Sequence, residues 1–467
     1  MASSRRSRPA DADRGAGIAR VREAVSAALR AHAPAVRRIA VALSGGRDSI
    51  ALLDATDAYA RAHGIDLAAL HVYHGLSQKA DAWAAFCARV CAERTVACVV
   101  TRVEVPREPR LSVEAEARRA RYAALDAAAR ARAIDVVLLA HHADDQIETV
   151  LLQLARGAGP HGLAAMPIAR HDRGVLWLRP WLEIARGELD AYIGALGLEF
   201  VDDESNAEPR FRRNAFRRDV VPALRAHTSG YPQTLVRAAT HQADAASLLD
   251  ELAAIDAASA FDGVALDCGA LTRLSEARAR NLLRWFLRQH GLPPPSLARL
   301  NAMLEQIADP RRDARIDLRH AGSRIGVFRG RIFVHPPTPE FHHVWRGEPQ
   351  VALPHGVLRF VRSHGVGLGV QAVAERETVV RPRSGGERIQ IARNRPRRAL
   401  SAWLSEAGVA SWERAALPLV FCGEALAAVP GIGVDVAFAA AADHDGWQVV
   451  WEPRRMYGTG EYADVDA

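Results

Sequence analysis

Cysteine is scarce in this sequence of 467 residues, and its few copies are not spaced like a metal or redox site. The five cysteines are Cys87, Cys91, Cys98, Cys268 and Cys422. Their number is odd and no two of them form Cys-x-x-Cys, which argues against a disulfide framework and against a zinc site. We expect buried free thiols in a reducing compartment.

Long apolar runs and a secretory signal are missing as well. No uninterrupted apolar run approaches the roughly 18 residues that a membrane span needs. The first residues, MASSRRSRPADADRGAG, are polar and basic and lack the apolar centre of a signal peptide. We therefore expect a disordered basic tail over residues 1–20, no membrane partner and a cytoplasmic location.

The charge is only mildly unbalanced, with a formal net charge of +7 at pH 7. An excess of arginine suits a polyanionic partner, but charge alone does not separate nucleic acid from other partners. No internal repeat is present. The length predicts about three domains, and a hydrophobic fraction of 49% is ample for a large core.

Short apolar runs alternate with helical segments in the first half of the chain. The runs IAVAL (39–43), LAALHVY (67–73), VACVVTRVEV (96–105) and IDVVLLA (134–140) read as strands. Alternation of this kind predicts an α/β fold with a doubly wound, mostly parallel sheet. Ligands of such sheets bind outside the carboxyl ends of the strands, where SGGRDS, HVYHGL and AHHADDQIE follow the runs.

The remaining chain changes in character. The segment TLVRAATHQADAASLLDELAAI predicts a long amphipathic helix, and RIGVFRGRIFV reads as a strand. We expect a catalytic domain over residues 21–226, a mainly helical domain over 230–335, a linker with strands over 336–369 and a small α/β domain over 370–455.

The segment SGGRDS, residues 44–49, joins the first strand to a helix. Consecutive glycines let the backbone turn its N–H groups toward one point, and the following helix adds its positive end. The hydroxyls of Ser44 and Ser49 add donors, so the segment predicts a phosphate cradle. No Gly-Lys-Ser/Thr follows, so it is not a Walker A loop.

Asp48 is unexpected in a site for anions alone. Its carboxylate would repel phosphate unless a cation lies between them, so Mg²⁺ carried by a nucleotide is the natural inference. The alternative is an ordinary strand–turn–helix junction capped by serine and aspartate.

Two carboxylates fall on one face of the helix predicted in HHADDQIETVLLQL. His141, Asp145 and Glu148 are spaced four and three residues apart, so they share a face if the helix begins near His141. Carboxylates in this arrangement suit an ammonium group and favour loss of its proton when the amine must act as a nucleophile. A capped, solvated helix start and a His/Asp/Glu metal site are the alternatives.

The motifs together carry a resemblance. SGGRDS resembles the pyrophosphate loop of the N-type ATP pyrophosphatases. Further segments resemble, in the expected order, motifs of the tRNA(Ile)-lysidine synthetase family within that superfamily: HVYHGL (71–76), EAEARRARYAAL (114–125), AHHADDQIETVLLQLARGAGPHGLAAM (140–166), RPWL (179–182), DDESN (202–206) and FRRNAFRRDVVPAL (211–224). The GAGPHG within the third segment follows a helix, so it is not a dinucleotide fingerprint.

The resemblance implies a ligase that uses ATP with Mg²⁺. In the family, the cytidine at the first anticodon position of tRNA(Ile) (CAU) is adenylated at C2 and then attacked by L-lysine, which changes codon reading from AUG to AUA. The loop residues that would bind ATP are Ser44, Gly45, Gly46, Arg47, Asp48 and Ser49.

Other residues are carried over from the same motifs. Asp48, His141, Asp145 and Glu148 would be catalytic, and the last three would hold lysine. Asp48 would also meet the metal. The residues that would contact tRNA or substrate are Arg118, Tyr122, Arg213, Asn214 and Arg217.

The second half resembles the family less tightly. Residues 380–390 and 397–435 resemble its last domain, which engages the tRNA acceptor end, and the helical domain is expected to bind tRNA. The sequence departs from the family at Ser401, where lysine is common, and at Ala410 and Ser411, where proline usually precedes the tryptophan.

Two other functions are alternatives. A tRNA thiolation enzyme of the same superfamily would need a sulfur-carrying cysteine or Cys-x-x-Cys, which is missing. A non-catalytic RNA-binding protein would not need an intact SGGRDS. A homodimer is left open by the sequence.

Overall fold

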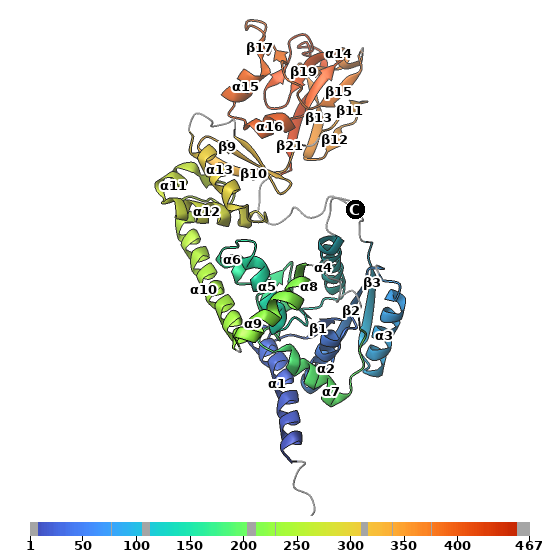
Figure 1. The fold of residues 1–467 in the computed structure, drawn as a ribbon. Helices are drawn as coiled ribbons and strands as arrows, with labels where there is room; N and C mark the ends of the chain where they lie inside the picture. Colours follow the sequence, from blue (N-terminus) through green and yellow to red (C-terminus); the bar gives the residue numbers. More distant parts are fainter. Residues whose placement is uncertain are drawn as a thin grey trace, which may run out of the picture. The chain divides into compact units, whose positions relative to one another are not determined.

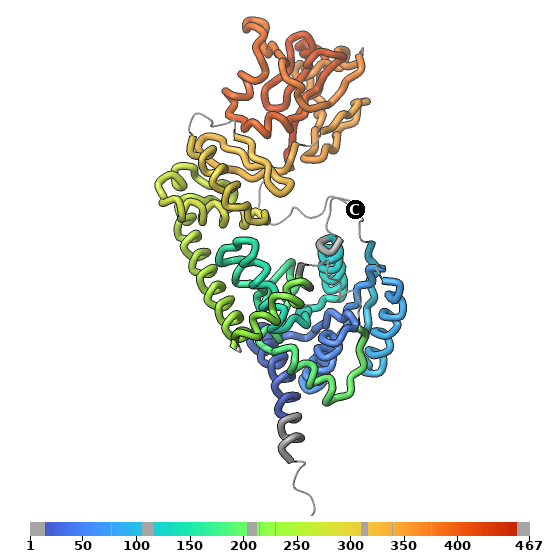
Figure 2. Tube along the Cα trace, viewed as in Figure 1, coloured from blue at the N-terminus to red at the C-terminus, as the bar shows by residue number. Residues whose placement is uncertain are grey.

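The chain is described here from a computed structural model. It describes residues 8–75, 77–104, 113–202, 212–228, 230–309, 316–338, 340–374 and 376–454. Two compact units divide the protein, Met1–Ser247 and Leu248–Ala467. The boundary falls inside helix α10 (Tyr231–Ala257), and Figure 2 shows this helix as one continuous coil.

A six-stranded sheet organises the first unit, in the order β3-β2-β1-β4-β6-β5. All neighbouring strands are parallel except β5, which is antiparallel to β6. The strands are β1 (Arg38–Ala42), β2 (Asp66–Tyr73), β3 (Ala97–Arg102), β4 (Val136–Leu138), β5 (Ala169–Asp172) and β6 (Val175–Leu178). The apolar runs of the sequence form β1 to β4, as predicted.

Helices cover both faces of this sheet, so the doubly wound architecture is confirmed (Figure 1). The helical elements are α1 (Arg8–His32), α2 (Arg47–His63), α3 (Ala80–Glu93), α4 (Val113–Ala131), α5 (Ala143–Leu154), α6 (Pro160–Leu163), α7 (Arg186–Leu196), α8 (Arg212–Ala215), the π-helix η2 (Phe216–Val220) and α9 (Val221–His227). One core cluster joins α1, α2, α3 and α7 to one face, and a second joins α4 to the other.

Helix α1 begins inside the segment expected to be a disordered tail. From Arg8 onward that segment is helical, so the expectation does not hold there. The physical reason lies further along the same helix, where Val21, Val25 and Leu29 are fully buried against the sheet's core. Spacings of four residues put these side chains on one face, and their burial fixes the helix that precedes them.

The second unit is less helical at its start than the sequence predicted. Helices α11 (Cys268–Arg273), α12 (Glu276–Gln289) and α13 (Leu297–Ala308) pack on a four-stranded sheet, β7-β10-β9-β8. Its strands are β7 (Leu266–Asp267), β8 (Asp317–His320), β9 (Ser323–Phe328) and β10 (Arg331–His335). The single strand predicted over 324–334 is therefore a hairpin, which turns at Arg329 and Gly330 with positive φ at both residues.

The C-terminal part of this unit holds two further sheets, β11-β15-β18-β19-β20 and β12-β13-β21-β14, with antiparallel pairs throughout. A two-stranded ladder, β16-β17, adjoins them. The strands are β11 (His343–Trp345), β12 (Gln350–Leu353), β13 (Gly356–His364), β14 (Leu368–Gly369), β15 (Thr378–Arg381), β16 (Arg388–Ile389), β17 (Arg398–Ala399), β18 (Leu419–Cys422), β19 (Ala425–Val429), β20 (Gly433–Val434) and β21 (Asp445–Pro453). The helices are α14 (Val370–Ala374), α15 (Leu400–Glu406) and α16 (Ser411–Ala416).

Trp412 on α16 joins these sheets to the β9–β10 hairpin. Its ring stacks on His335, with 4.7 Å between the ring centroids. It also lies over Gly326 of β9, where an added Cβ would collide with the ring. Glycine at 326 is therefore what lets the tryptophan approach the sheet backbone.

Candidate active site

The SGGRDS segment lies at the carboxyl end of β1 and leads into α2, as predicted. Ser49 Oγ donates to the carbonyl oxygen of Gly46 at 2.8 Å and lies 3.0 Å from Ser44 Oγ. Gly46 N in turn donates to Ser44 Oγ at 3.3 Å. The two hydroxyls thus tie the loop into a closed shape at the N-terminus of α2, where the helix dipole favours an anion.

Gly45 is the residue through which this loop packs against the rest of the unit. Its φ is +86°, a left-handed conformation that glycine adopts most readily. A Cβ added here would lie 3.0 Å from Cys87 Sγ, and Val201 N donates to the Gly45 carbonyl at 2.9 Å. The loop therefore rests on α3 and on the segment after α7, with no room for a side chain.

Asp48 faces His142, a residue that the sequence did not single out. His142 Nε2 lies 3.7 Å from Asp48 Oδ2 and 3.6 Å from Asp145 Oδ2. Burial opposes ionisation of Asp48, but contact with His142 and the charge of Arg47 outweigh burial and lower its pKa. Burial also opposes protonation of His142, yet Asp48, Asp145 and Asp144 together raise the pKa of its imidazole.

His141 and His142 point to opposite sides. The helix α5 begins at Ala143 with His142 as N-cap, so His141 precedes the helix and does not share its face, contrary to the sequence-based expectation. His142 has extended backbone angles, φ −125° and ψ −179°, and successive side chains of an extended chain alternate. His142 faces Asp48 of the SGGRDS loop, whereas the charges of Arg179, Arg118 and Arg213 act on His141, and Asp145 interacts with both rings.

His141 is buried among positive groups. Burial, together with the charges of Arg179, Arg118 and Arg213, lowers the pKa of its imidazole to about 3, although Asp145 opposes this. The ring is therefore neutral at neutral pH. Its Nδ1 is buried and has no hydrogen-bond partner among the described residues.

Asp145 and Glu148 share one face of α5, as predicted, and both are already paired with arginine side chains. Arg213 Nε donates to Glu148 Oε2 at 2.7 Å, and Arg217 Nε donates to Oε1 at 2.5 Å. Arg213 also donates to Asp145 Oδ1 at 3.1 Å. Glu148 is buried, and the two arginines come from α8 and η2. Two carboxylates and two guanidinium groups thus balance in charge.

Arg118 and Tyr122 lie together on α4, as predicted from their motif. The Arg118 guanidinium lies 5.2 Å from the centre of the Tyr122 ring. Tyr122 in turn packs against Trp177 of β6, with 5.5 Å between the ring centroids. Asn214 belongs to α8, and its side chain lies outside what the structure describes.

Sequence reasoning missed two residues of this site, His142 and Arg179. His142 adjoins a residue that was singled out, and the alternation of an extended chain was the available signal. Arg179 opens the motif RPWL, which was noted without a role for any residue. Arg179 is buried directly after β6, and the next strand along the sheet, β4, leads to His141.

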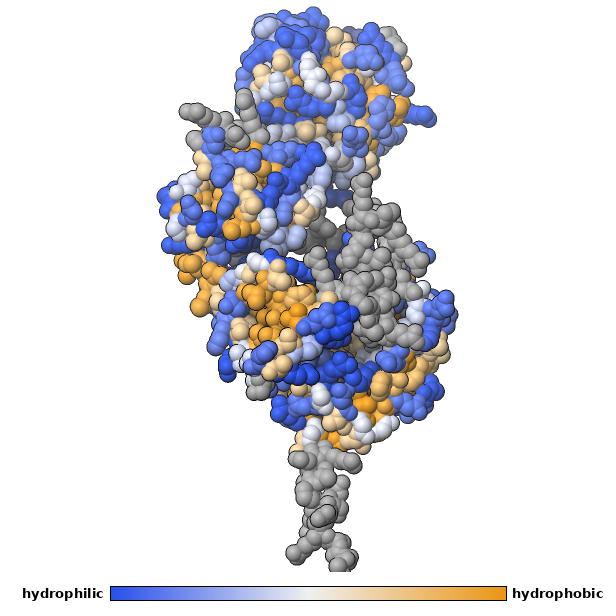
Figure 3. Space-filling view, viewed as in Figure 1, coloured by the Kyte–Doolittle hydropathy of each residue, from blue (hydrophilic) through white to orange (hydrophobic). Residues whose placement is uncertain are grey.

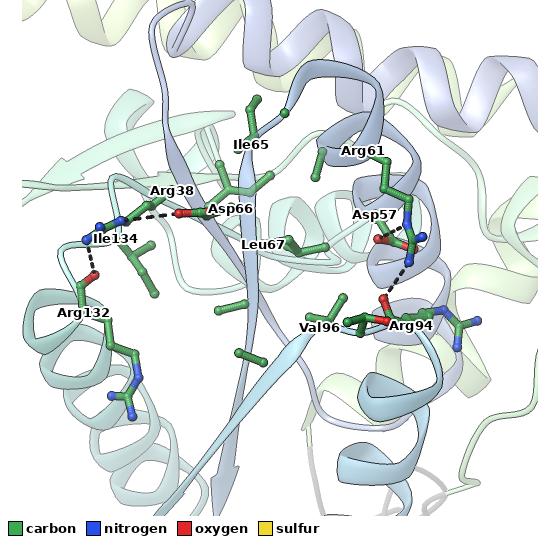
Figure 4. Close-up of a pocket in the computed structure, with 16 residues that line it drawn as sticks. Arg38, Asp57, Arg61, Ile65, Asp66, Leu67, Arg94, Val96, Arg132 and Ile134 are labelled. Atoms are coloured by element: carbon green, nitrogen blue, oxygen red, sulfur yellow. Dashed lines mark hydrogen bonds and ion pairs between the residues drawn. The ribbon is translucent and has the colours of Figure 1, made fainter.

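A hollow of about 650 Å³ lies at the opposite edge of the sheet (Figure 4). Arg38, Asp66 and Ala97 line it, and these residues open β1, β2 and β3. Figure 4 shows Arg61 bonded to Asp57 and to the carbonyl of Arg94. Because ligands of such sheets bind at the carboxyl ends of the strands, this hollow is not the site built by the SGGRDS loop.

A resident metal centre is not built into the described part of the chain, where no group of three or more His, Cys, Asp or Glu side chains could hold an ion. Asp48 remains the carboxylate that could meet a cation arriving with a nucleotide, because its lowered pKa keeps it ionised and its side chain is 31% exposed. No described helix is long and apolar enough to cross a membrane.

Three family models match successive parts of the chain. A PP-loop domain model matches residues 20–224, a TilS substrate binding domain model matches residues 266–333, and a TilS substrate C-terminal domain model matches residues 378–451. Among solved structures, the chain resembles the U34-tRNA thiolase NcsA from Methanococcus maripaludis with a TM-score of 0.42 and 17% identity, over 49% of this chain and 79% of that one.

Curated relatives extend over most of the chain. It is 38% identical to a tRNA(Ile)-lysidine synthase of Nitrosomonas europaea, over 92% of this chain and 94% of that protein. It is 40% identical to a tRNA(Ile)-lysidine synthase of Ralstonia nicotianae, over 90% of this chain and 93% of that protein. Identity at this level and coverage, together with the loop and the α5 carboxylates, shows that the chain belongs to the tRNA(Ile)-lysidine synthase family.

Proposed function

We propose that the protein joins L-lysine to C2 of the cytidine at the first anticodon position of tRNA(Ile) (CAU), with ATP as co-substrate. The C2 oxygen of the cytidine attacks the α-phosphate of ATP, pyrophosphate leaves, and an adenylated tRNA forms. The ε-amine of lysine then attacks C2 and displaces AMP. The product reads AUA in place of AUG, and the enzyme is a ligase that forms a carbon–nitrogen bond.

The observation that carries this proposal is the position of His142 between Asp48 and Asp145. Its Nε2 lies within 4 Å of both carboxylates, at 3.7 and 3.6 Å. A loop suited to phosphates and a helix face suited to an ammonium group are therefore neighbours. A reaction that consumes ATP and an amine needs this juxtaposition, because the activated atom and the nucleophile must meet.

ATP is assigned to the loop of Ser44, Gly45, Gly46, Arg47, Asp48 and Ser49. The positive end of α2 and the loop N–H groups oppose the charge that develops on the phosphates. Asp48 would hold Mg²⁺, which would supply further positive charge to the phosphates. Arg47 pairs with Asp190 at 2.7 Å and with Asp48 at 3.2 Å, so it orients Asp48 as well as facing the nucleotide.

Lysine is assigned to Asp145, Glu148 and His141. Arg213 and Arg217 already neutralise the carboxylates, so the ammonium group of lysine adds charge to a balanced cluster. We expect the two guanidinium groups to turn toward phosphates of ATP or tRNA as these bind, which releases the carboxylates. Tighter lysine binding in the presence of a non-hydrolysable ATP analogue would be the sign of this exchange.

Loss of a proton makes the ε-amine a nucleophile. His141 is neutral and has an unpartnered Nδ1, so it can accept a hydrogen bond from the ammonium group. Its pKa of about 3 makes it a weak base, and Asp145 is a weak base too because its contacts with the histidines and Arg213 lower its pKa against the effect of burial. The proton that lysine loses is therefore shared by His141 and Asp145 and is not held by one residue.

RNA is assigned to a surface beside the same helix. Leu154 at the end of α5 is 61% exposed and Ile168 is 42% exposed, and Figure 3 shows apolar surface over α5 and α6. Arginines of η2 adjoin α5. Unstacked bases rest on apolar surface and phosphates pair with arginine, so this combination suits an anticodon loop. The second unit would bind the tRNA body and acceptor end.

The decisive experiment is incorporation of labelled lysine into an unmodified tRNA(Ile) transcript with a CAU anticodon, with and without ATP. We expect incorporation that needs ATP and that is lost when the first anticodon base is changed from C. RNA-stimulated cleavage of ATP to AMP without lysine incorporation would overturn the proposal and direct attention to another nucleophile, with sulfur first. The curated relatives favour lysine over sulfur.

A cytoplasmic location belongs to this proposal, because ATP, lysine and tRNA meet there. A homodimer stays a prediction, and the mass of the protein in solution would test it.

A further inference from the structure

Arg179 is a buried guanidinium group without an anionic partner. Its side chain lies directly after β6, and the residue is 5% exposed. One terminal nitrogen, Nη1, donates to the carbonyl oxygen of Pro167 at 3.0 Å, while Nε is buried without a partner. Among the described residues no carboxylate lies within 4.0 Å of it. Burial lowers the pKa of this guanidinium, which reflects the cost of a buried positive charge.

The chain around Arg179 runs beside the chain around His141. Leu139 N donates to Leu178 O at 2.8 Å, and His142 and Trp181 form a parallel bridge. Arg179 therefore stands on the side of β4 that is away from the SGGRDS loop, because β1, β4 and β6 follow one another in the sheet. The imidazole of His141 lies close enough to Arg179 for the charge of the guanidinium to act on it.

Arg118 and Tyr122 complete the group. Contact with Tyr122 favours the charged form of Arg179, whereas the nearby charge of Arg118 opposes it. Arg118 is exposed, so this member of the group can be reached from solvent. The positive charges of Arg179 and Arg118 both act on the neutral imidazole of His141, and so does the carboxylate of Asp145. Arg213 and Arg217 already balance the α5 carboxylates, whereas no carboxylate balances Arg179 among the described residues.

We propose that Arg179, together with Arg118, binds the α-carboxylate of the free amino acid that the enzyme consumes. This inference rests on the proposed function, in which that amino acid is lysine. Arginine pairs with carboxylates through two parallel hydrogen bonds, and Nε is one of the donors that this geometry uses. The pairing would satisfy the buried Nε. It would also let the enzyme select a free amino acid against amines that lack a carboxylate.

A phosphate is the other anion that could meet a guanidinium here. The loop for phosphates stands at the end of β1, and the β4 segment with its two histidines separates that loop from Arg179. His142 and Asp48 occupy the side toward the loop. A carboxylate attached to lysine needs no such proximity to the loop, because the lysine chain spans the gap between its two charged ends. The position therefore favours the amino acid over the nucleotide.

The test compares lysine with lysinamide, in which a neutral amide replaces the carboxylate. In the Arg179→Met enzyme we expect the KM for lysine to rise about 10- to 100-fold, the effect of losing a hydrogen-bonded ion pair. The KM for lysinamide, and those for ATP and tRNA, should change less than about threefold. Arg359→Met is the control. Arg359 is an exposed arginine on β13 that pairs with Glu452, and its loss should leave all four values unchanged.

Each other result has a definite meaning. An equal rise in KM for lysine and lysinamide would overturn the proposal and make Arg179 structural. A rise in KM for ATP or tRNA alone would assign the guanidinium to a phosphate. If Arg179→Met fails to fold, Arg179→Lys is the second variant, because it keeps the positive charge. Retained discrimination between lysine and lysinamide in this variant would support the proposal. Loss of discrimination at an unchanged unfolding temperature would contradict the proposal that the charge at this position binds the carboxylate. A wild-type enzyme that never joins lysine to tRNA would instead overturn the proposed function itself.

Discussion

Arg213 donates a hydrogen bond of 2.7 Å from Nε to Oε2 of Glu148. Sequence motifs assigned these two residues to different substrates, one to RNA or phosphate and the other to lysine. In the folded chain they are partners, so each controls the charge that the other presents. A change at either position therefore alters both substrate sites, and mutational data on one must be interpreted with the other in mind.

Glu148→Gln should weaken the use of lysine more than the use of ATP. The amide keeps the shape of the carboxylate but removes the charge that an ammonium group needs. We expect the KM for lysine to rise about 10- to 100-fold. The KM for ATP should change by a smaller factor, because Arg213 and Arg217 lose a charged partner but keep their own charge. Steady-state kinetics with each substrate varied in turn would measure this.

Glu199→Gln is the control for that change. Glu199 pairs with Arg89 at 2.7 Å on the surface, and its side chain is 72% exposed. Exposed ion pairs contribute little, so kinetics and stability should stay near those of the wild type. An unchanged lysine KM in Glu148→Gln would remove Glu148 from the lysine site.

Asp48→Asn should abolish adenylation while tRNA still binds. The amide cannot hold Mg²⁺ with a full negative charge, so we expect kcat to fall by about 100- to 1000-fold. Filter binding should give a Kd for tRNA within about threefold of the wild-type value. Asp57→Asn, on the same helix α2 but bonded to Arg61, serves as control. Loss of tRNA binding in Asp48→Asn would mean that the loop is structural.

Gly45→Ala should disable the loop more than it destabilises the protein. The new methyl group meets Cys87 Sγ at 3.0 Å, and φ is +86°. A left-handed alanine costs about 1–2 kcal/mol of unfolding free energy. Gly64 at the end of α2 has φ +65° with nothing within 4 Å, so Gly64→Ala carries the same backbone strain without the contact. Gly45→Ala should therefore lose somewhat more thermal stability than Gly64→Ala, and only Gly45→Ala should lose ATP-dependent activity.

The contact between Asp48 and His142 should make stability depend on pH. The folded protein raises the pKa of His142, so its contribution is complete below the unfolded value near 6.5 and disappears as pH rises through the folded pKa. The folded protein lowers the pKa of Asp48, so that contribution is lost only as pH falls below the unfolded value near 3.8. The contact is thus strongest between about pH 4 and 6.5.

Chemical unfolding of the wild type and of His142→Asn over pH 5 to 9 would measure this dependence. We expect the wild-type advantage to be largest at the acid end and to shrink above about pH 6.5. An advantage that grows with pH would mean that the imidazole is neutral in the folded state.

The joint made by Trp412 and Gly326 allows a double-mutant test within the second unit. Trp412→Ala removes a buried ring, which should cost about 3–5 kcal/mol. Gly326→Ala forces a methyl group into that ring and should cost about 1–3 kcal/mol. In the Trp412→Ala background the second change should cost much less, because the ring is gone. Additive effects would show that the two residues are not in contact.

Much of the first unit followed from local pattern. The apolar runs formed β1 to β4 because strands of a parallel sheet are buried on both faces and so cannot alternate. The apolar pattern predicts one strand where β9 and β10 form a hairpin, although Gly330 is a turn signal. The pattern also missed α1, because its first residues are polar while the valines that bury it come later.

The sequence predicts most residues of the site but not the residues that they contact. The spacing of Asp145 and Glu148 on α5 was a local fact of helical geometry. Their pairing with Arg213 and Arg217 joins positions 65 or more residues apart, and no local period reports such a contact. No role for Arg179 follows from the sequence for the same reason. Its role is inferred from its burial and from its lack of an anionic partner, and both are properties of the folded chain.

The two histidines before α5 show that spacing itself is a functional property of this chain. Which of the two rings contacts Asp48 depends on the number of residues between β4 and the histidine. Each step along an extended chain reverses the direction of the side chain. Inserting or deleting a single residue there would exchange the two rings without altering either. A one-residue shift would therefore disrupt the site even though both histidines are still present in the chain.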